Sequence, residues 1–223
     1  MKKKNRRFCI GDIHGELDYL IQVIKKSNIN YENDELIFLG DVMDRGLHPF
    51  KCMDELLKFK NLILIKGNHD SSFISHIHNG FSFLDSNSGT EVSIDAWNNL
   101  SKKEKIYYNE QFLDKMIDYY ISDDNIIFTH GGFDRLKKVE SQISNVFQWD
   151  RELVNQAMSC TNKQKLKTVD NFKEIFIGHT PTIYWDIKEP IIKGGVVNVD
   201  TGSGKGGKLT IMDIDTKEYW QSN

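Results

Sequence analysis

The chain has 223 residues with 29 basic and 32 acidic side chains, so its formal net charge is −3. This near balance gives no basis for a nucleic-acid partner or an anionic membrane partner. Its apolar share of 39% is typical of a globular protein. Three cysteines are too few and too scattered for a disulfide scaffold, which favours a reducing compartment. At about 100–200 residues per domain, a single domain over residues 1–223 is the simplest interpretation.

The basic residues at 1–7 do not indicate a targeting segment. The apolar run behind it comprises only Phe8, Cys9 and Ile10. A signal peptide needs about 7–15 apolar residues there, and a membrane span needs about 18. We therefore expect a cytoplasmic protein without a membrane partner.

Six short apolar runs predict buried strands, because they are rich in β-branched and aromatic residues and end in glycine or polar residues. They lie at 8–10, 36–39, 62–65, 126–128, 175–177 and 196–199. Runs that are apolar on both faces suit a covered sheet in an α/β protein. Apolar residues at helical spacing in 16–27 and 49–60 predict helices between the first strands, and hence βαβ units.

The rest of the chain is less regular. The stretch 71–124 is polar with scattered aromatics, and Phe112, Met116, Tyr119 and Tyr120 have helical spacing. We interpret it as a mostly helical insertion. The stretch 152–173 also reads as helical, and residues 208–220 alternate as strands.

The segment Gly202–Gly207 matches G-x-G-x-x-G, the pattern of dinucleotide-binding loops. That fingerprint requires a helix to follow, whereas Lys208 and the residues after it read as a strand. A tight hairpin turn is the better interpretation.

Side chains that can bind metals follow five of the predicted strands. In open α/β sheets, ligands bind beyond the carboxyl ends of the strands. The residues at these places are Asp12, His14, Asp41, Asn68, His69, His130 and His179. Carboxylate, amide and imidazole donors without thiolates suit borderline-hard divalent metals. Six ligand positions among these residues exceed what one catalytic zinc takes and suit two ions sharing a carboxylate, as in phosphatases.

Five motifs together carry a family resemblance: GDIHG (11–15), GDVMDRG (40–46), GNHD (67–70), HGG (130–132) and GHT (178–180). In this order, they resemble the phosphoprotein-phosphatase branch of the calcineurin-like metallophosphoesterases, especially small bacterial and phage serine/threonine protein phosphatases. The resemblance implies a four-layer α-β-β-α sandwich with a helical insertion.

The resemblance also implies roles for residues. The first ion would be held by Asp12, His14 and Asp41, and the second by the bridging Asp41 with Asn68, His130 and His179. The nucleophile would be a metal-bridging water or hydroxide. His69 would be the general acid, oriented and kept cationic by Asp44.

Phosphate binding would fall to Arg45, whose planar fork suits phosphate oxygens, together with Asn68. The family implies a second arginine. Of the five arginines, Arg135 and Arg151 are the candidates, and the Trp-Asp-Arg segment ending at Arg151 favours the latter. Asp70 could structure its loop or orient His69, and we leave it out of the catalytic set.

The expected activity is a dinuclear metal-dependent phosphomonoesterase, with phosphoserine and phosphothreonine proteins as the leading substrates. A symmetrical dinucleoside-tetraphosphate hydrolase, or another small-molecule phosphoesterase, is the alternative within the superfamily. A catalytically inactive binding module is a third interpretation, weakened because every expected ligand position is filled. Manganese is the expected metal, although the same donors accept iron and zinc.

Overall fold

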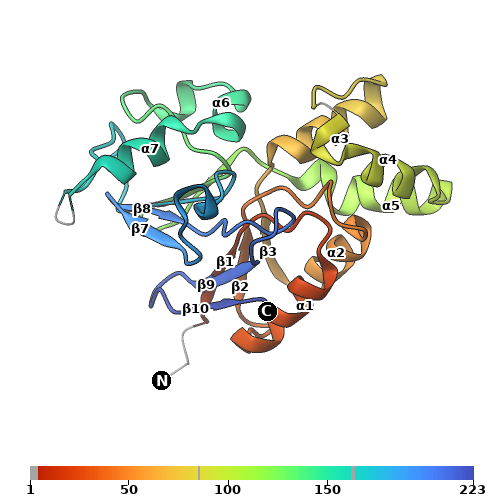
Figure 1. The fold of residues 1–223 in the computed structure, drawn as a ribbon, viewed down its shortest axis with the longest axis horizontal. Helices are drawn as coiled ribbons and strands as arrows, with labels where there is room; N and C mark the ends of the chain where they lie inside the picture. Colours follow the sequence, from red (N-terminus) through yellow and green to blue (C-terminus); the bar gives the residue numbers. More distant parts are fainter. Residues whose placement is uncertain (1–4, 85, 162–163) are drawn as a thin grey trace.

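A computed structural model describes residues 5–84, 86–161 and 164–223, so the lysines of the basic start lie outside the described residues. Two five-stranded sheets form its centre (Figure 1). The first has the order β10-β9-β1-β2-β3 and the second the order β4-β5-β6-β8-β7. No helix in the described ranges is long and apolar enough to span a membrane.

The first sheet is parallel at its core. β1 (Arg7–Ile10), β2 (Glu35–Phe38) and β3 (Asn61–Leu64) run parallel, while β9 (Thr210–Asp213) and β10 (Tyr219–Gln221) add an antiparallel edge. In the second sheet β5 (Ile126–Thr129), β6 (Glu174–Ile177) and β8 (Val196–Asn198) are parallel. β4 (Tyr119–Ile121) and β7 (Ile191–Lys193) pair antiparallel at its edges.

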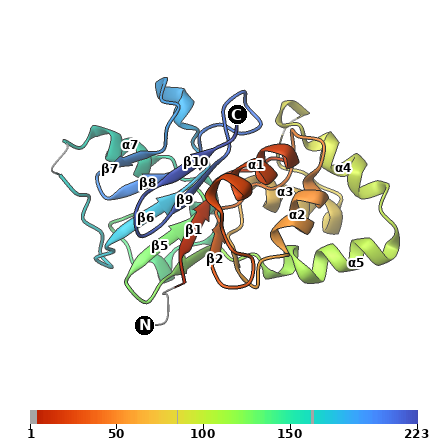
Figure 2. The ribbon, with the colours of Figure 1, turned by 90° about the horizontal axis from the view of Figure 1, so that it is seen from below.

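Helices cover the outer faces of both sheets (Figure 2). α1 (Leu17–Ser27), α2 (Pro49–Leu56), α3 (Asn68–Asn79), α4 (Thr90–Asn98) and α5 (Lys102–Gln111) lie on the side of the first sheet. α6 (Ser144–Trp149) and α7 (Glu152–Ser159) lie on the side of the second. Short 3₁₀ turns are η1 (Ser86–Ser88), η2 (Leu113–Lys115), η3 (Val139–Ser141) and η4 (Thr182–Trp185).

Side chains that alternate along each strand fill the two cores on either side of a sheet. Phe8 and Ile10 of β1 enter the core beneath α1 and α2, whereas Cys9 between them enters the core shared by the two sheets. Because successive strand residues point to opposite faces, a strand that is apolar throughout is buried on both sides. The four-layer α-β-β-α fold and all six predicted strands are confirmed.

Three expectations about the elements need correction. Residues 112–120 do not form one helix: α5 ends at Gln111, and β4 pairs with β5 in the second sheet. The predicted helix 152–173 is helical only over α7, which ends at Ser159, and β6 begins at Glu174. The segment 202–207 turns tightly but does not form a β-hairpin, because β8 and β9 on either side of it belong to different sheets. In addition, the edge strand β7 was not predicted. The division into one domain with an insertion at 71–124 stays a prediction.

Candidate metal centre and active site

The predicted ligands lie at the ends of parallel strands or at the start of a helix, and their side chains come together in one cluster. Asp12 and His14 follow β1, Asp41 follows β2, and Asn68 opens α3. His130 and His179 follow β5 and β6, so both sheets contribute. All six side chains are at most 5% exposed. The structure therefore brings together the six predicted ligands, while their role as ligands stays a prediction.

The backbone bends sharply to aim these side chains. His14, Asp41 and His179 have positive φ values of 50°, 63° and 67°. Such conformations cost non-glycine residues about 1–3 kcal/mol each and gather at functional sites. Glycines allow the close approach of the loops: a Cβ on Gly67 would lie 2.0 Å from Asp41 Oδ1, and one on Gly178 2.4 Å from Asp12 Oδ1.

Two of the histidines are oriented through the ring nitrogen that faces away from the site. His14 Nδ1 lies 2.7 Å from the carbonyl oxygen of Met43, and His130 Nδ1 lies 2.7 Å from that of Leu39. Donation of Nδ1–H to these carbonyls leaves Nε2 free to bind a metal, an arrangement typical of metal-ligating histidines.

The free Nε2 atoms converge on one carboxylate. His14 Nε2 lies 3.7 Å and His130 Nε2 3.3 Å from Asp41 Oδ2. Asn68 Oδ1 lies 3.1 Å from His130 Nε2. His179 Nε2 is buried without a hydrogen-bond partner among the described residues. A buried nitrogen beside carboxylates, left without a partner, fits a metal ligand.

Two triads of potential donors lie with all ligand atoms within 4.8 Å of one another: His14, Asp41 and His69, and Asp41, His130 and His179. The second triad consists of predicted ligands of one ion. The first contains His69 in place of Asp12. However, both ring nitrogens of His69 have other partners, whereas Asp12 Oδ2 lies 3.9 Å from His14 Nε2. The contacts thus favour Asp12 over His69 as the ligand.

Asp41 is the electrostatic centre of the cluster. Burial opposes its ionisation, but His130, His69 and His14 outweigh burial and hold the pKa of Asp41 well below its usual range. Burial also disfavours a charged His130, yet Asp41 and Asp12 raise its pKa to about 10. Burial, opposed by His130, raises the pKa of Asp12 to about 6. The site is built around buried negative charge that a cation would compensate.

His69 and Asp44 form a close pair. His69 Nδ1 donates to Asp44 Oδ2 at 2.6 Å, and the Arg45 guanidinium approaches His69 Nε2 at 3.0 Å. The backbone N–H of His69 donates to Asp41 Oδ1 at 2.9 Å. This bond links the pair to the six candidate metal ligands described above, which we call the metal-ligand cluster. This geometry fits the predicted general acid and its orienting carboxylate.

The segment between β3 and β4 supports this pair, which the sequence did not reveal. The N–H of Asp44 donates to Ser93 Oγ at 2.7 Å, and that of Arg45 donates to the carbonyl of Gly89 at 3.2 Å. Thr90 Oγ1 lies 3.5 Å from Asp44 Oδ2. Asp44 and Arg45 have φ values of 73° and 67°, so α4 stabilises a strained turn. The contacts span more than 40 residues of chain, and no local motif marks them.

Two further aspartates support the site. Asp70 accepts hydrogen bonds from the N–H groups of Asp41, Val42, Met43 and Gly67 at 2.7–3.3 Å. It therefore structures the loop, one of the two roles left open by the sequence. Asp200 accepts from the N–H of Gly202 at 2.9 Å. Its position in Asp200-Thr201-Gly202, directly after a predicted strand, was the available signal.

The two candidate arginines have different surroundings. Arg151 donates to Thr180 Oγ1 at 3.1 Å and lies 3.4 Å from the carbonyl oxygen of His179. Arg135 donates to Gln156 Oε1 and to the carbonyl of Lys167. Arg151 thus borders the metal-ligand cluster, as the sequence favoured, and Arg135 packs against α7.

Comparisons with known proteins support the same family. The family model of calcineurin-like phosphoesterases matches residues 6–201. The chain is 27% identical to the asymmetrical bis(5'-nucleosyl)-tetraphosphatase PrpE of Halalkalibacterium halodurans, over 94% of this chain and 90% of that protein. It is 21% identical to serine/threonine-protein phosphatase 1 of Salmonella typhimurium, over 96% and 95%.

A solved structure extends the likeness to the fold. A candidate diadenosine tetraphosphatase superposes with a TM-score of 0.67 at 14% identity, covering 99% of this chain and 94% of that one. The matched segment contains the metal-ligand cluster, the His69–Asp44 pair and both arginine candidates. The chain belongs to the calcineurin-like phosphoesterase family, and its relatives are consistent with the phosphoprotein-phosphatase branch.

Proposed function

We propose that this phosphoesterase uses two divalent cations, with Asp41 shared between them. Asp12 and His14 complete one set of ligands, and Asn68, His130 and His179 complete the other. The observation that supports this most strongly is the convergence of the Nε2 atoms of His14 and His130 on Asp41 Oδ2. Bound cations would supply Lewis-acid stabilisation of the phosphoryl oxygens and acidify the attacking water. Manganese is the metal we propose, and iron and zinc suit the same donors.

His69 protonates the leaving oxygen in this proposal. Water forms the new P–O bond, the bond to the leaving group breaks, and the leaving oxygen takes a proton from His69 Nε2. Asp44 keeps Nδ1 protonated and fixes the ring, which leaves Nε2 aimed into the site. Arg45 contacts Nε2 in the structure, so substrate binding must draw its guanidinium onto the phosphate before Nε2 can act as an acid.

Arg45, Arg151 and Asn68 hold the phosphate. One arginine lies beside His69 and the other beside His179. A guanidinium binds two phosphate oxygens at once, which orients phosphorus for in-line attack.

Two substrate classes suit this chemistry. Phosphoserine and phosphothreonine proteins are the first, in keeping with the motif set. Dinucleoside tetraphosphates are the second, favoured by five PrpE relatives that match this chain over 87–90% of their lengths at 25–27% identity. Those relatives are named asymmetrical, whereas the sequence suggested a symmetrical hydrolase as the alternative.

Parallel turnover assays separate the two classes. Manganese-loaded protein is incubated with a phosphothreonine peptide and with diadenosine tetraphosphate at equal concentration, and kcat/KM is compared. Release of AMP and ATP from the nucleotide would indicate asymmetrical cleavage, and release of ADP alone symmetrical cleavage. Hydrolysis of neither, with p-nitrophenyl phosphate also untouched, would contradict the proposal.

A further inference from the structure

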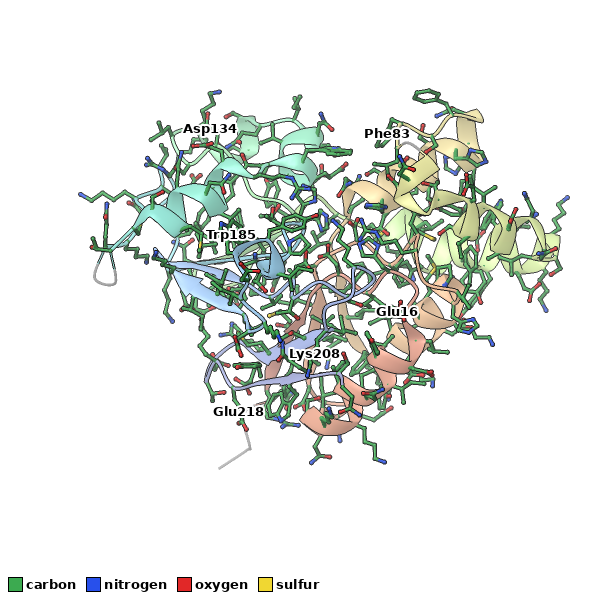
Figure 3. All side chains as sticks on the ribbon, in the orientation of Figure 1. Glu16, Phe83, Asp134, Trp185, Lys208 and Glu218 are labelled. Atoms are coloured by element: carbon green, nitrogen blue, oxygen red, sulfur yellow. The ribbon has the colours of Figure 1, made fainter. Side chains whose placement is uncertain are left out.

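The glycine-rich turn between β8 and β9 carries a lysine with an uncommon partner. Lys205 Nζ lies 2.6 Å from the hydroxyl of Tyr184 and 5.0 Å from the centroid of its ring. Tyr184 belongs to η4, directly after the loop that bears His179, and its side chain is largely exposed. Figure 3 labels Trp185, the residue after Tyr184 in η4, and Lys208, which follows the glycine-rich turn.

The turn packs directly on the site. A Cβ on Gly204 would lie 2.8 Å from His14 Cβ and 3.2 Å from Arg45 Cδ. Ser203 Oγ donates to the carbonyl of Ile13 at 3.0 Å, and the N–H groups of Lys205 and Gly207 both donate to the carbonyl of Gly202 at 2.9 Å. Lys205 therefore extends from a fixed turn that touches a candidate metal ligand and the phosphate-binding Arg45.

The hydrogen-bond partner of the Lys205 ammonium is a hydroxyl and not a carboxylate. Within the part of the chain that the structure describes, Lys205 forms no ion pair. Burial and Asp12 raise the pKa of Asp200 well above its usual range, and the charge of Lys205 acts in the opposite direction. Because its partner is the neutral Tyr184 hydroxyl, the Lys205 ammonium can still bind an anion. Its effect on Asp200 shows that its charge reaches the site.

We propose that Lys205, positioned by Tyr184, binds a second phosphate group of the substrate, next to the phosphate held by Arg45. The substrate class that uses this subsite is a chain of linked phosphates, such as a nucleoside polyphosphate. A phosphoserine side chain has no second phosphate to offer. This inference rests on the proposed function, and it favours phosphoanhydride substrates over phosphoproteins.

Selectivity between two substrates tests the subsite. Lys205→Met removes the charge, and Lys208→Met is the matched control, because Lys208 is a lysine at the end of the same turn. For each protein, kcat/KM is measured with inorganic tripolyphosphate and with p-nitrophenyl phosphate. A charge-assisted hydrogen bond to phosphate predicts that the tripolyphosphate-to-monoester ratio falls about tenfold or more in Lys205→Met. Lys208→Met should keep the wild-type ratio.

Binding provides a readout independent of turnover. Thermal unfolding of the metal-loaded protein is followed with tripolyphosphate and with orthophosphate. Lys205→Met should lose most of the extra Tm increase that tripolyphosphate gives beyond orthophosphate, and Tyr184→Phe should lose a smaller part.

The outcomes are separable. An unchanged ratio in Lys205→Met, or an equal fall in Lys208→Met, would overturn the subsite. If the wild-type protein hydrolyses no phosphoester, the proposed function fails, and the unfolding measurement still decides the subsite: equal Tm increases with the two anions would refute it.

Discussion

The two arginines proposed to bind phosphate, Arg45 beside His69 and Arg151 beside His179, are held in different ways. Arg45 sits in a turn of positive φ whose backbone is bonded to Gly89. Arg151 is exposed at the start of α7, and its side chain reaches Thr180 on a neighbouring loop. A distant segment fixes the backbone of Arg45. The backbone of Arg151 is bonded only locally, where its carbonyl accepts from the N–H of Asn155 in α7, and its exposed side chain contacts Thr180. We infer that Arg45 is preorganised for phosphate and Arg151 is adaptable.

The largest expected effect on the Arg45 side comes from the acid itself. His69→Asn should lower kcat about 10²–10⁴-fold on a phosphothreonine peptide, whose alkoxide leaving group needs a proton. The loss should be smaller on p-nitrophenyl phosphate, because its leaving group is weakly basic. Steady-state kinetics on both substrates checks this, with metal content confirming that the site still loads. Equal losses on the two substrates would contradict the role of His69 as an acid.

The next largest effect is expected from substitution of the two arginines, whose losses of kcat/KM can be compared directly. Arg45→Lys should reduce kcat/KM about 10- to 100-fold, because lysine loses a charge-assisted bond to phosphate in a preorganised position. Arg151→Lys should cost less, since its exposed side chain has freedom to readjust. The same assay on both variants measures this. A greater loss for Arg151→Lys would reverse the comparison.

A smaller effect is expected when the contact between α4 and Asp44 is removed. Ser93→Ala removes the acceptor for the buried N–H of Asp44, and an unsatisfied buried donor costs about 1–3 kcal/mol. We expect kcat to fall about 3- to 10-fold through misplacement of Asp44 and His69.

Ser101→Ala is the matched control for Ser93→Ala. Ser101 caps α5 in the same segment, where its hydroxyl accepts from the N–H of Glu104. Its loss should cost about 0.5–2 kcal/mol of stability and leave kcat unchanged. Urea unfolding and kcat are measured for both variants. If kcat falls equally in both, the effect of Ser93 is general destabilisation.

The smallest expected effect is at Arg135, the other candidate arginine. Arg135→Lys should leave kcat/KM within about twofold of the wild type, because Arg135 bonds to Gln156 and Lys167 rather than to the site. A loss as large as that of Arg151→Lys, measured with p-nitrophenyl phosphate, would show that the two candidates were assigned the wrong way round.

The sequence predicted those features of the fold and the site that local residue patterns encode. Strands such as 36–39 are apolar throughout, and the polar residues that follow them, such as Asp41, mark the strand ends. The helix expected near Tyr119 and Tyr120 was wrong. These two residues, with Phe112 and Met116, have helical spacing, but pairing with β5 makes Tyr119–Ile121 a strand. Ser93 was missed since its contact with Asp44 depends on how α4 packs, which no local pattern encodes.

In the mechanism we propose, Asp41 is shared by two cations that the reaction requires. The direct test is hydrolysis of p-nitrophenyl phosphate by chelator-stripped protein to which manganese is returned, with Asp41→Asn in parallel and metal counted in both. We predict that the wild-type protein regains activity with about two ions per chain, and that Asp41→Asn binds fewer and loses at least about 10²-fold in kcat. Activity that survives chelation, or an Asp41→Asn protein as active as wild type, would contradict the account.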